Sequence, residues 1–155
     1  MSTPLHSILA EKGWDVITVL DTDPLARVCE TLARHGVGGA PVLDGAGRLV
    51  GLVSERKIVE AVALHPAGLG ALVARDVMAA NMPVATPDED SLNTARRMTR
   101  THCRHMPVVD NGRLVGLVSI GDLVKYRIEH AEHLAEELQN YVSNSGHASV
   151  KVSGI

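Results

Sequence analysis

Two segments at the start of expected helices carry side chains that could bind a ligand. The segment Ser119–Asp122 reads SIGD, the segment Ser54–Lys57 reads SERK, and the same seven residues, RLVGLVS, end at the serine of each segment. A helix N-terminus attracts phosphate, and a carboxylate such as Asp122 can accept two hydrogen bonds from a ribose diol. A serine and an aspartate at this spacing also suit a helix cap. Spacing alone does not choose between the two interpretations.

The two segments are predicted to be chemically unequal. Lys57 stands three residues after Ser54, where the other copy has Asp122 three residues after Ser119. An ammonium group donates hydrogen bonds and accepts none. Lys57 therefore cannot hold a diol as a carboxylate does, although it could bind an anion.

Other reactive side chains give weaker signals. His102, Cys103 and His105 lie together in the segment THCRH. Zinc sites usually take four converging ligands from two separated pairs, and no second pair is evident in the sequence. We therefore expect no metal site. Nucleophilic catalysis needs a base that a third group orients, and no such set can be inferred, so we expect no enzyme.

Composition narrows the class of partner. The chain has 155 residues, 45% of them hydrophobic, with no Phe, one Trp and a net charge of −3. Single-stranded nucleic acid is usually bound on aromatic side chains, and DNA attracts basic surfaces, so we expect no nucleic-acid partner. No apolar run approaches the ~20 residues that span a bilayer. Cys29 and Cys103 make no disulfide framework, which favours a cytoplasmic protein.

The repeat organises the whole chain. APVLDGAGRLVGLVS (Ala40–Ser54) aligns with MPVVDNGRLVGLVS (Met106–Ser119), and apolar positions upstream match at a constant offset of 66. In the second copy, 83–86 reads as a strand, 91–101 as a helix, and two apolar runs joined by Asp-Asn-Gly as a hairpin that leads into another helix. The glycine within each heptapeptide, Gly51 or Gly116, indicates a bulge or a close backbone approach.

These features predict an α+β fold made of two strand–helix–strand–strand–helix units. We expect an N-terminal helical segment at 1–14, repeat 1 at 15–66, a linker at 67–76 and repeat 2 at 77–130. A C-terminal helix extension at 131–143 and a flexible tail at 144–155 follow. The extension is amphipathic, with Leu134 and Leu138 among mixed charges, and we expect it to contact a second copy rather than to be solvated.

The combination MPVVDNGRLVGLVSIGDLV resembles the CBS-domain pair, that is, the cystathionine-β-synthase domain tandem or Bateman module. The resemblance covers about Asp15 to Ile128, and the flanking segments are similar to those of small stand-alone bacterial members. It implies two CBS units related by a pseudo-two-fold axis and a flat homodimer. It also implies an adenosine ligand between the repeats (AMP, ADP, ATP, S-adenosylmethionine or NAD(H)) and no chemistry.

The resemblance also implies roles for particular residues. Asp122 would bind the ribose hydroxyls, Ser119 the ribose or phosphate, and Arg104 the phosphate. The expected main site is completed by Thr86, His105, Met106 and Ile120. Ser54 and Lys57 would form a weak second site, because Lys57 and Leu20 depart from the family pattern.

Three functional hypotheses follow. The first is a regulatory sensor with one main adenosine-nucleotide site per chain, no catalytic cofactor and an unidentified protein partner that it regulates. The second is an interaction protein with vestigial clefts that scaffolds a partner. The third, a nucleotide-using enzyme, lacks an identifiable base, metal or nucleophile.

Overall fold

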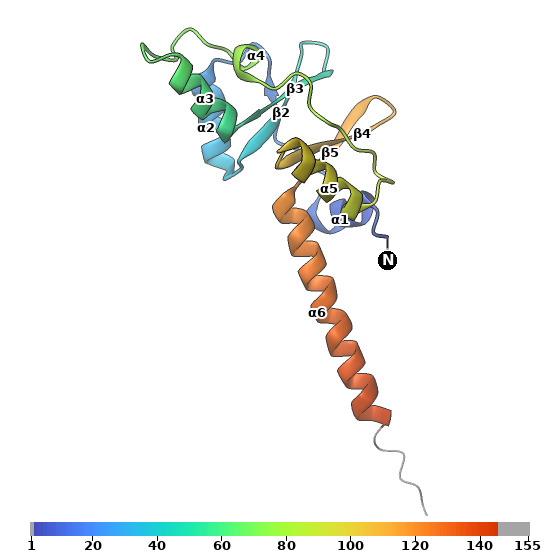
Figure 1. Cartoon of the computed structure of the whole chain (residues 1–155). Coiled ribbons are helices and arrows are strands. Elements are labelled where there is room, and N and C mark those ends of the chain that lie inside the picture. Colours follow the sequence, from blue (N-terminus) through green and yellow to red (C-terminus); the bar gives the residue numbers. More distant parts are fainter. Residues whose placement is uncertain (1, 146–155) are drawn as a thin grey trace, which may run out of the picture.

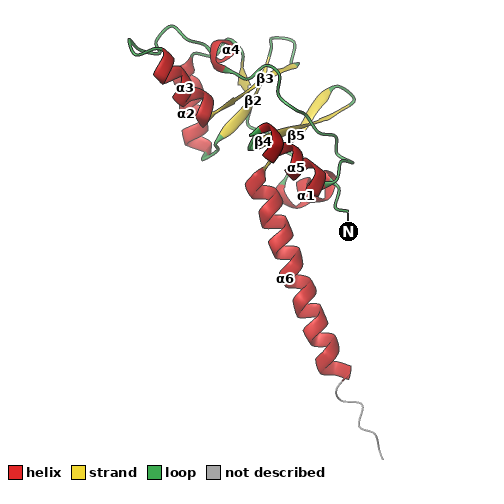
Figure 2. Cartoon of the chain, viewed as in Figure 1, coloured by secondary structure: helices red, strands yellow, loops and turns green. Residues whose placement is uncertain are grey.

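The computed structural model describes residues 2–145 and shows two small lobes of helices and strands from which one long helix projects (Figure 1). The first lobe contains β1 (Val19–Leu20), α2 (Leu25–His35), β2 (Gly39–Leu43), β3 (Leu49–Ser54), α3 (Glu55–Leu64) and α4 (Ala74–Val77). The second contains α1 (Leu5–Lys12), α5 (Ser91–Thr101), β4 (His105–Asp110), β5 (Arg113–Ser119) and the beginning of α6 (Ile120–Ser145). Figure 2 shows the same mixture of helices and short strands. The α+β class predicted from the sequence is confirmed.

Each lobe is built on an antiparallel hairpin. β2 pairs with β3 and β4 with β5, and β1 adds a short parallel strand beside β2. The strand expected at 83–86 is reduced to a single bridge, in which Ala85 hydrogen-bonds to Pro107 and Val109. Pro83 and Pro87 on either side lack the amide N–H that would extend the ladder.

The mid-strand glycines mark both a bulge and a close approach. Gly51 and Gly116 face Val42 and Val108, and the register shifts at the next residue in both hairpins. A Cβ atom on Gly116 would lie 2.7 Å from Leu9 Cδ1, and one on Gly51 would collide with the side chain of Met78. The glycines therefore provide the space into which these two side chains pack.

The segments that precede the repeats are exchanged between them. Leu5, Ile8 and Leu9 of α1 are buried in the core of the second repeat. Ala74 and Val77 of α4, which comes just before the second repeat, belong to the core of the first. Figure 1 shows α1 beside α5, away from α2 and α3 of the first lobe. The helix that precedes repeat 1 thus completes repeat 2.

Helix α6 starts in the second lobe and projects beyond it to Ser145 (Figure 1). Leu123 is buried near its start, whereas Ile128, Leu134 and Leu138 are exposed. Residues 146–155, most of the tail expected to be flexible, lie outside the described residues. No helix within residues 2–145 is both long enough and apolar enough to cross a bilayer.

Candidate functional site

The beginning of α6 is closed by two reciprocal hydrogen bonds. Ser119 Oγ accepts from the Asp122 amide at 3.0 Å, and Asp122 Oδ2 accepts from the Ser119 amide at 2.8 Å. This is a capping box in which aspartate replaces the usual glutamate. At the beginning of α3, Ser54 Oγ accepts from the Lys57 amide at a longer 3.4 Å, and the Lys57 ammonium turns to Glu60. Both serines are caps, but only Ser119 has a carboxylate, that of Asp122, three residues later, where Ser54 has Lys57.

The side chain of Lys12 reaches the same turn from α1. Its ammonium donates to Asp122 Oδ2 and to the Leu117 carbonyl, each at 2.6 Å. Partial burial of the Asp122 carboxyl raises its pKa, but the bonds from Lys12 and Ser119 outweigh this effect and hold the pKa below its ordinary value. Asp122 is therefore a carboxylate at neutral pH and already has a cationic partner.

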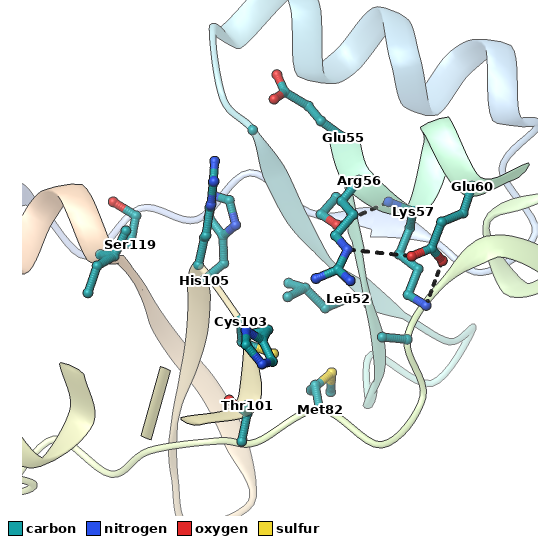
Figure 3. Close-up of a pocket in the computed structure, with 16 residues that line it drawn as sticks. Leu52, Glu55, Arg56, Lys57, Glu60, Met82, Thr101, Cys103, His105 and Ser119 are labelled. Carbon is teal, nitrogen blue, oxygen red and sulfur yellow. Dashed lines mark hydrogen bonds and ion pairs between the residues drawn. The ribbon is translucent and has the colours of Figure 1, made fainter. Parts of the chain in front are cut away.

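A cleft of about 900 Å³ lies between the two repeats. Figure 3 shows its walls: the first turns of α3 on one side and the strand that begins at His105 on the other. Arg56, Lys57 and Arg104 contribute positive charge, while Glu55 and Glu60 contribute negative charge. The amide N–H groups at the start of α3 and these cations suit an anionic ligand.

His105 lies at the contact between the repeats. Its ring covers Gly39, where an added Cβ would lie 3.0 Å from Nδ1. Burial lowers the pKa of His105 below its ordinary value, and the positive charge of Lys12 lowers it further. The charges of Asp122 and Glu55 oppose this shift. His105 lines the large cleft, and its pKa depends on the charges of Lys12 and Asp122 in the smaller hollow.

The structure divides the predicted site residues among different places. Asp122 lines a smaller hollow of about 370 Å³ between α1 and α6, together with Lys12 and Lys125. Thr86 is exposed and Met106 is fully buried, and neither lines one of these two hollows. The large cleft brings together residues from both predicted sites: Ser54, Lys57, Arg104, His105, Ser119 and Ile120.

Sequence reasoning missed Lys12. The residue lies 110 positions before Asp122, in a segment whose sequence suggests only a short helix. Leu9, one helical turn before Lys12, packs on Gly116. The glycine in the middle of that strand was therefore the one feature of the sequence that could have indicated a segment packed against it. Within residues 2–145, no group of three or more His, Cys, Asp or Glu side chains could hold a metal ion.

The sequence model of the CBS domain matches residues 9–64 and 74–129. The chain belongs to the CBS-domain family. The first matched range begins within α1 and the second at the first residue of α4, the two segments that the repeats exchange. The tandem of CBS domains predicted from the sequence is confirmed.

Known proteins with the same CBS tandem include stand-alone pairs. The CBS-domain-containing protein ATU1752 from Agrobacterium tumefaciens is 35% identical, with a TM-score of 0.78, and the match covers 82% of this chain and 95% of that one. The uncharacterized protein MJ1225 from Methanocaldococcus jannaschii is 32% identical over 125 residues, which are 81% of this chain but only 43% of that protein.

The CBS-domain pair of protein MJ0100 is a further structural neighbour. It is 26% identical, with a TM-score of 0.71, and the match covers 80% of this chain and 98% of that one. That structure was solved in complex with 5′-methylthioadenosine and S-adenosyl-L-methionine. A CBS pair similar to this chain thus binds compounds that contain adenosine.

Proposed function

We propose that this CBS pair is a non-catalytic regulatory sensor that binds one adenosine nucleotide of the AMP, ADP, ATP or NAD(H) class between its repeats. The observation that carries the proposal is the unequal chemistry of the two helix starts. Asp122 offers a carboxylate to a ribose diol, whereas Lys57 offers an ammonium at the corresponding place. The adenosine compounds bound by the MJ0100 pair support this ligand class.

The ribose and the phosphate of such a ligand would contact different groups of the two hollows. The turn that begins α6 borders both, because Ser119 and Ile120 line the large cleft and Asp122 lines the smaller hollow. A ribose held at Asp122 therefore lies where the two hollows meet, with Lys12 in the smaller one and Arg56, Lys57 and Arg104 in the large one. Binding would shift the conformation of the pair by its different affinity for two arrangements of the repeats.

Calorimetric titration with AMP tests the proposal. We expect one AMP per chain and a rise in melting temperature, because a ligand that binds only the native state stabilises it. Two equivalent molecules per chain would refute the single main site. If AMP, ATP and NADH neither bind nor stabilise the protein, the sensor hypothesis is ruled out. The hypothesis of an interaction protein that scaffolds a partner then remains.

A specific observation supports a second role, in which α6 binds another copy of the chain. Exposed apolar residues follow one seam of α6 at alternating spacings of four and three, the pattern of a coiled coil: Val124, Ile128, Ala131, Ala135 and Leu138. In a parallel pair, Arg127 lies beside the seam opposite Glu132 of the second copy. These opposite charges favour a parallel homodimer.

The homodimer predicts a clear effect of a charge placed in the seam. Leu138→Glu puts a carboxylate at an exposed apolar position and should convert the dimer to monomer in sedimentation velocity at micromolar concentration, because a buried unpaired charge is costly. His133→Glu introduces the same charge on the opposite face and should leave the dimer intact. A monomeric wild-type protein, or equal dissociation of both variants, would contradict this arrangement.

A further inference from the structure

The N-terminal helix delivers Lys12 to the second repeat in a fixed position. Leu5 and Leu9 of α1 are fully buried there. The amides of Leu5 and His6 donate to the carbonyls of Glu89 at 3.0 Å and Pro87 at 2.9 Å. The far end of α1 is held as well, because Glu11 contacts His130 of α6 at 3.3 Å. Lys12 therefore extends from an anchored helix toward Asp122.

The two hydrogen bonds made to Asp122 fall on the same oxygen. Oδ2 accepts from the Ser119 amide and from the Lys12 ammonium. Both of these donors occupy one edge of the carboxylate. A ribose diol bound across the carboxylate donates one hydrogen bond to each oxygen, and Oδ2 already accepts two. The diol thus competes with Lys12 for Oδ2.

A displaced Lys12 needs a new partner. The ammonium and the carboxylate side chains retain 35% and 25% of their accessible surface, so a ligand can approach both groups. A phosphate on the ribose offers oxygens that an ammonium binds well. A neutral nucleoside offers no replacement charge, and a cationic sulfonium would repel the lysine.

We propose that Lys12 sets the ligand class of this site, favouring adenosine compounds with a phosphate next to the ribose over neutral or cationic ones. In the absence of ligand Lys12 holds Asp122, and in the complex it neutralises the phosphate. This role rests on the proposed function, since it requires a ribose at Asp122. It would distinguish this chain from the MJ0100 pair, whose ligands are a neutral thioether and a sulfonium.

The inference is tested with two probes, AMP and 5′-methylthioadenosine, titrated into the full chain. We expect the wild-type protein to prefer AMP. Lys12→Gln should weaken AMP binding and strengthen 5′-methylthioadenosine binding. The dissociation constant of 5′-methylthioadenosine divided by that of AMP should fall by about tenfold or more, which is the effect of losing one charge-assisted hydrogen bond to AMP.

Two further variants keep the test interpretable. Lys12→Arg retains the positive charge and should keep the preference for AMP. Arg34→Gln removes an exposed positive charge on α2 that lines neither hollow, and it should leave the ratio unchanged. If both probes bind and Lys12→Gln does not alter their ratio, the inference is overturned while the proposed function stands. If neither probe binds the wild-type protein, the inference is overturned, and titration with ATP and NADH then decides whether the proposed function stands.

Discussion

Asp122→Asn should weaken AMP binding by about tenfold to one hundredfold, since a hydrogen bond to a charged group contributes about 1.5–3 kcal/mol. Asparagine has nearly the same shape and can still accept the Ser119 amide, so the beginning of α6 stays capped. It loses the charge that attracts the ribose hydroxyls and has only one oxygen to accept them. Calorimetry with AMP measures the change directly.

Asp90→Asn is the matched control for this substitution. Asp90 caps α5 by accepting from the Asn93 amide at 3.2 Å, yet it lines neither hollow. We expect it to reduce stability slightly and to leave the AMP dissociation constant within about twofold, as for a residue without ligand contact. An equal loss of affinity in both variants, or none for Asp122→Asn, would contradict a ribose-binding Asp122.

Leu9→Ala should lower the free energy of unfolding by about 2–5 kcal/mol, the range for truncating a fully buried leucine. Leu9 is 0% exposed in the core of the second repeat. Its removal leaves a cavity above Gly116 and loosens the helix that carries Lys12. Urea denaturation followed by circular dichroism measures the change. Leu64→Ala, at a leucine that is 76% exposed on α3, should change stability by less than about 0.5 kcal/mol.

A double substitution tests whether Leu9 occupies the space left by Gly116. Gly116→Ala alone should destabilise the fold by about 1–3 kcal/mol, because the new methyl group crowds Leu9. In the double variant, the methyl group fills part of the cavity left by Leu9→Ala. The combined loss should therefore be smaller than the sum of the two single losses. Strict additivity would contradict the packing of α1 on the second repeat.

Local sequence patterns predicted the secondary structure well where residues adjacent in the sequence determine it. The helix expected at 91–101 matches α5, and the Asp-Asn-Gly turn joins β4 to β5. The serines of the repeated heptapeptide cap helices, as N-cap chemistry predicts. The strand expected at 83–86 is limited to one bridge at Ala85, because Pro83 and Pro87 have no amide N–H to extend its hydrogen bonds.

The site was predicted less completely, for a physical reason. A duplicated heptapeptide followed by Asp122 in one copy and Lys57 in the other shows from the sequence alone that the helix starts differ. It does not show which lobe α1 joins, because Leu5, Ile8 and Leu9 are buried among residues of the second repeat that are distant in the sequence. That packing brings Lys12 to Asp122 across 110 residues and places Asp122 outside the large cleft. The sequence by itself determined the two repeats and the chemistry available to each, and the packing between repeats decided which charges meet.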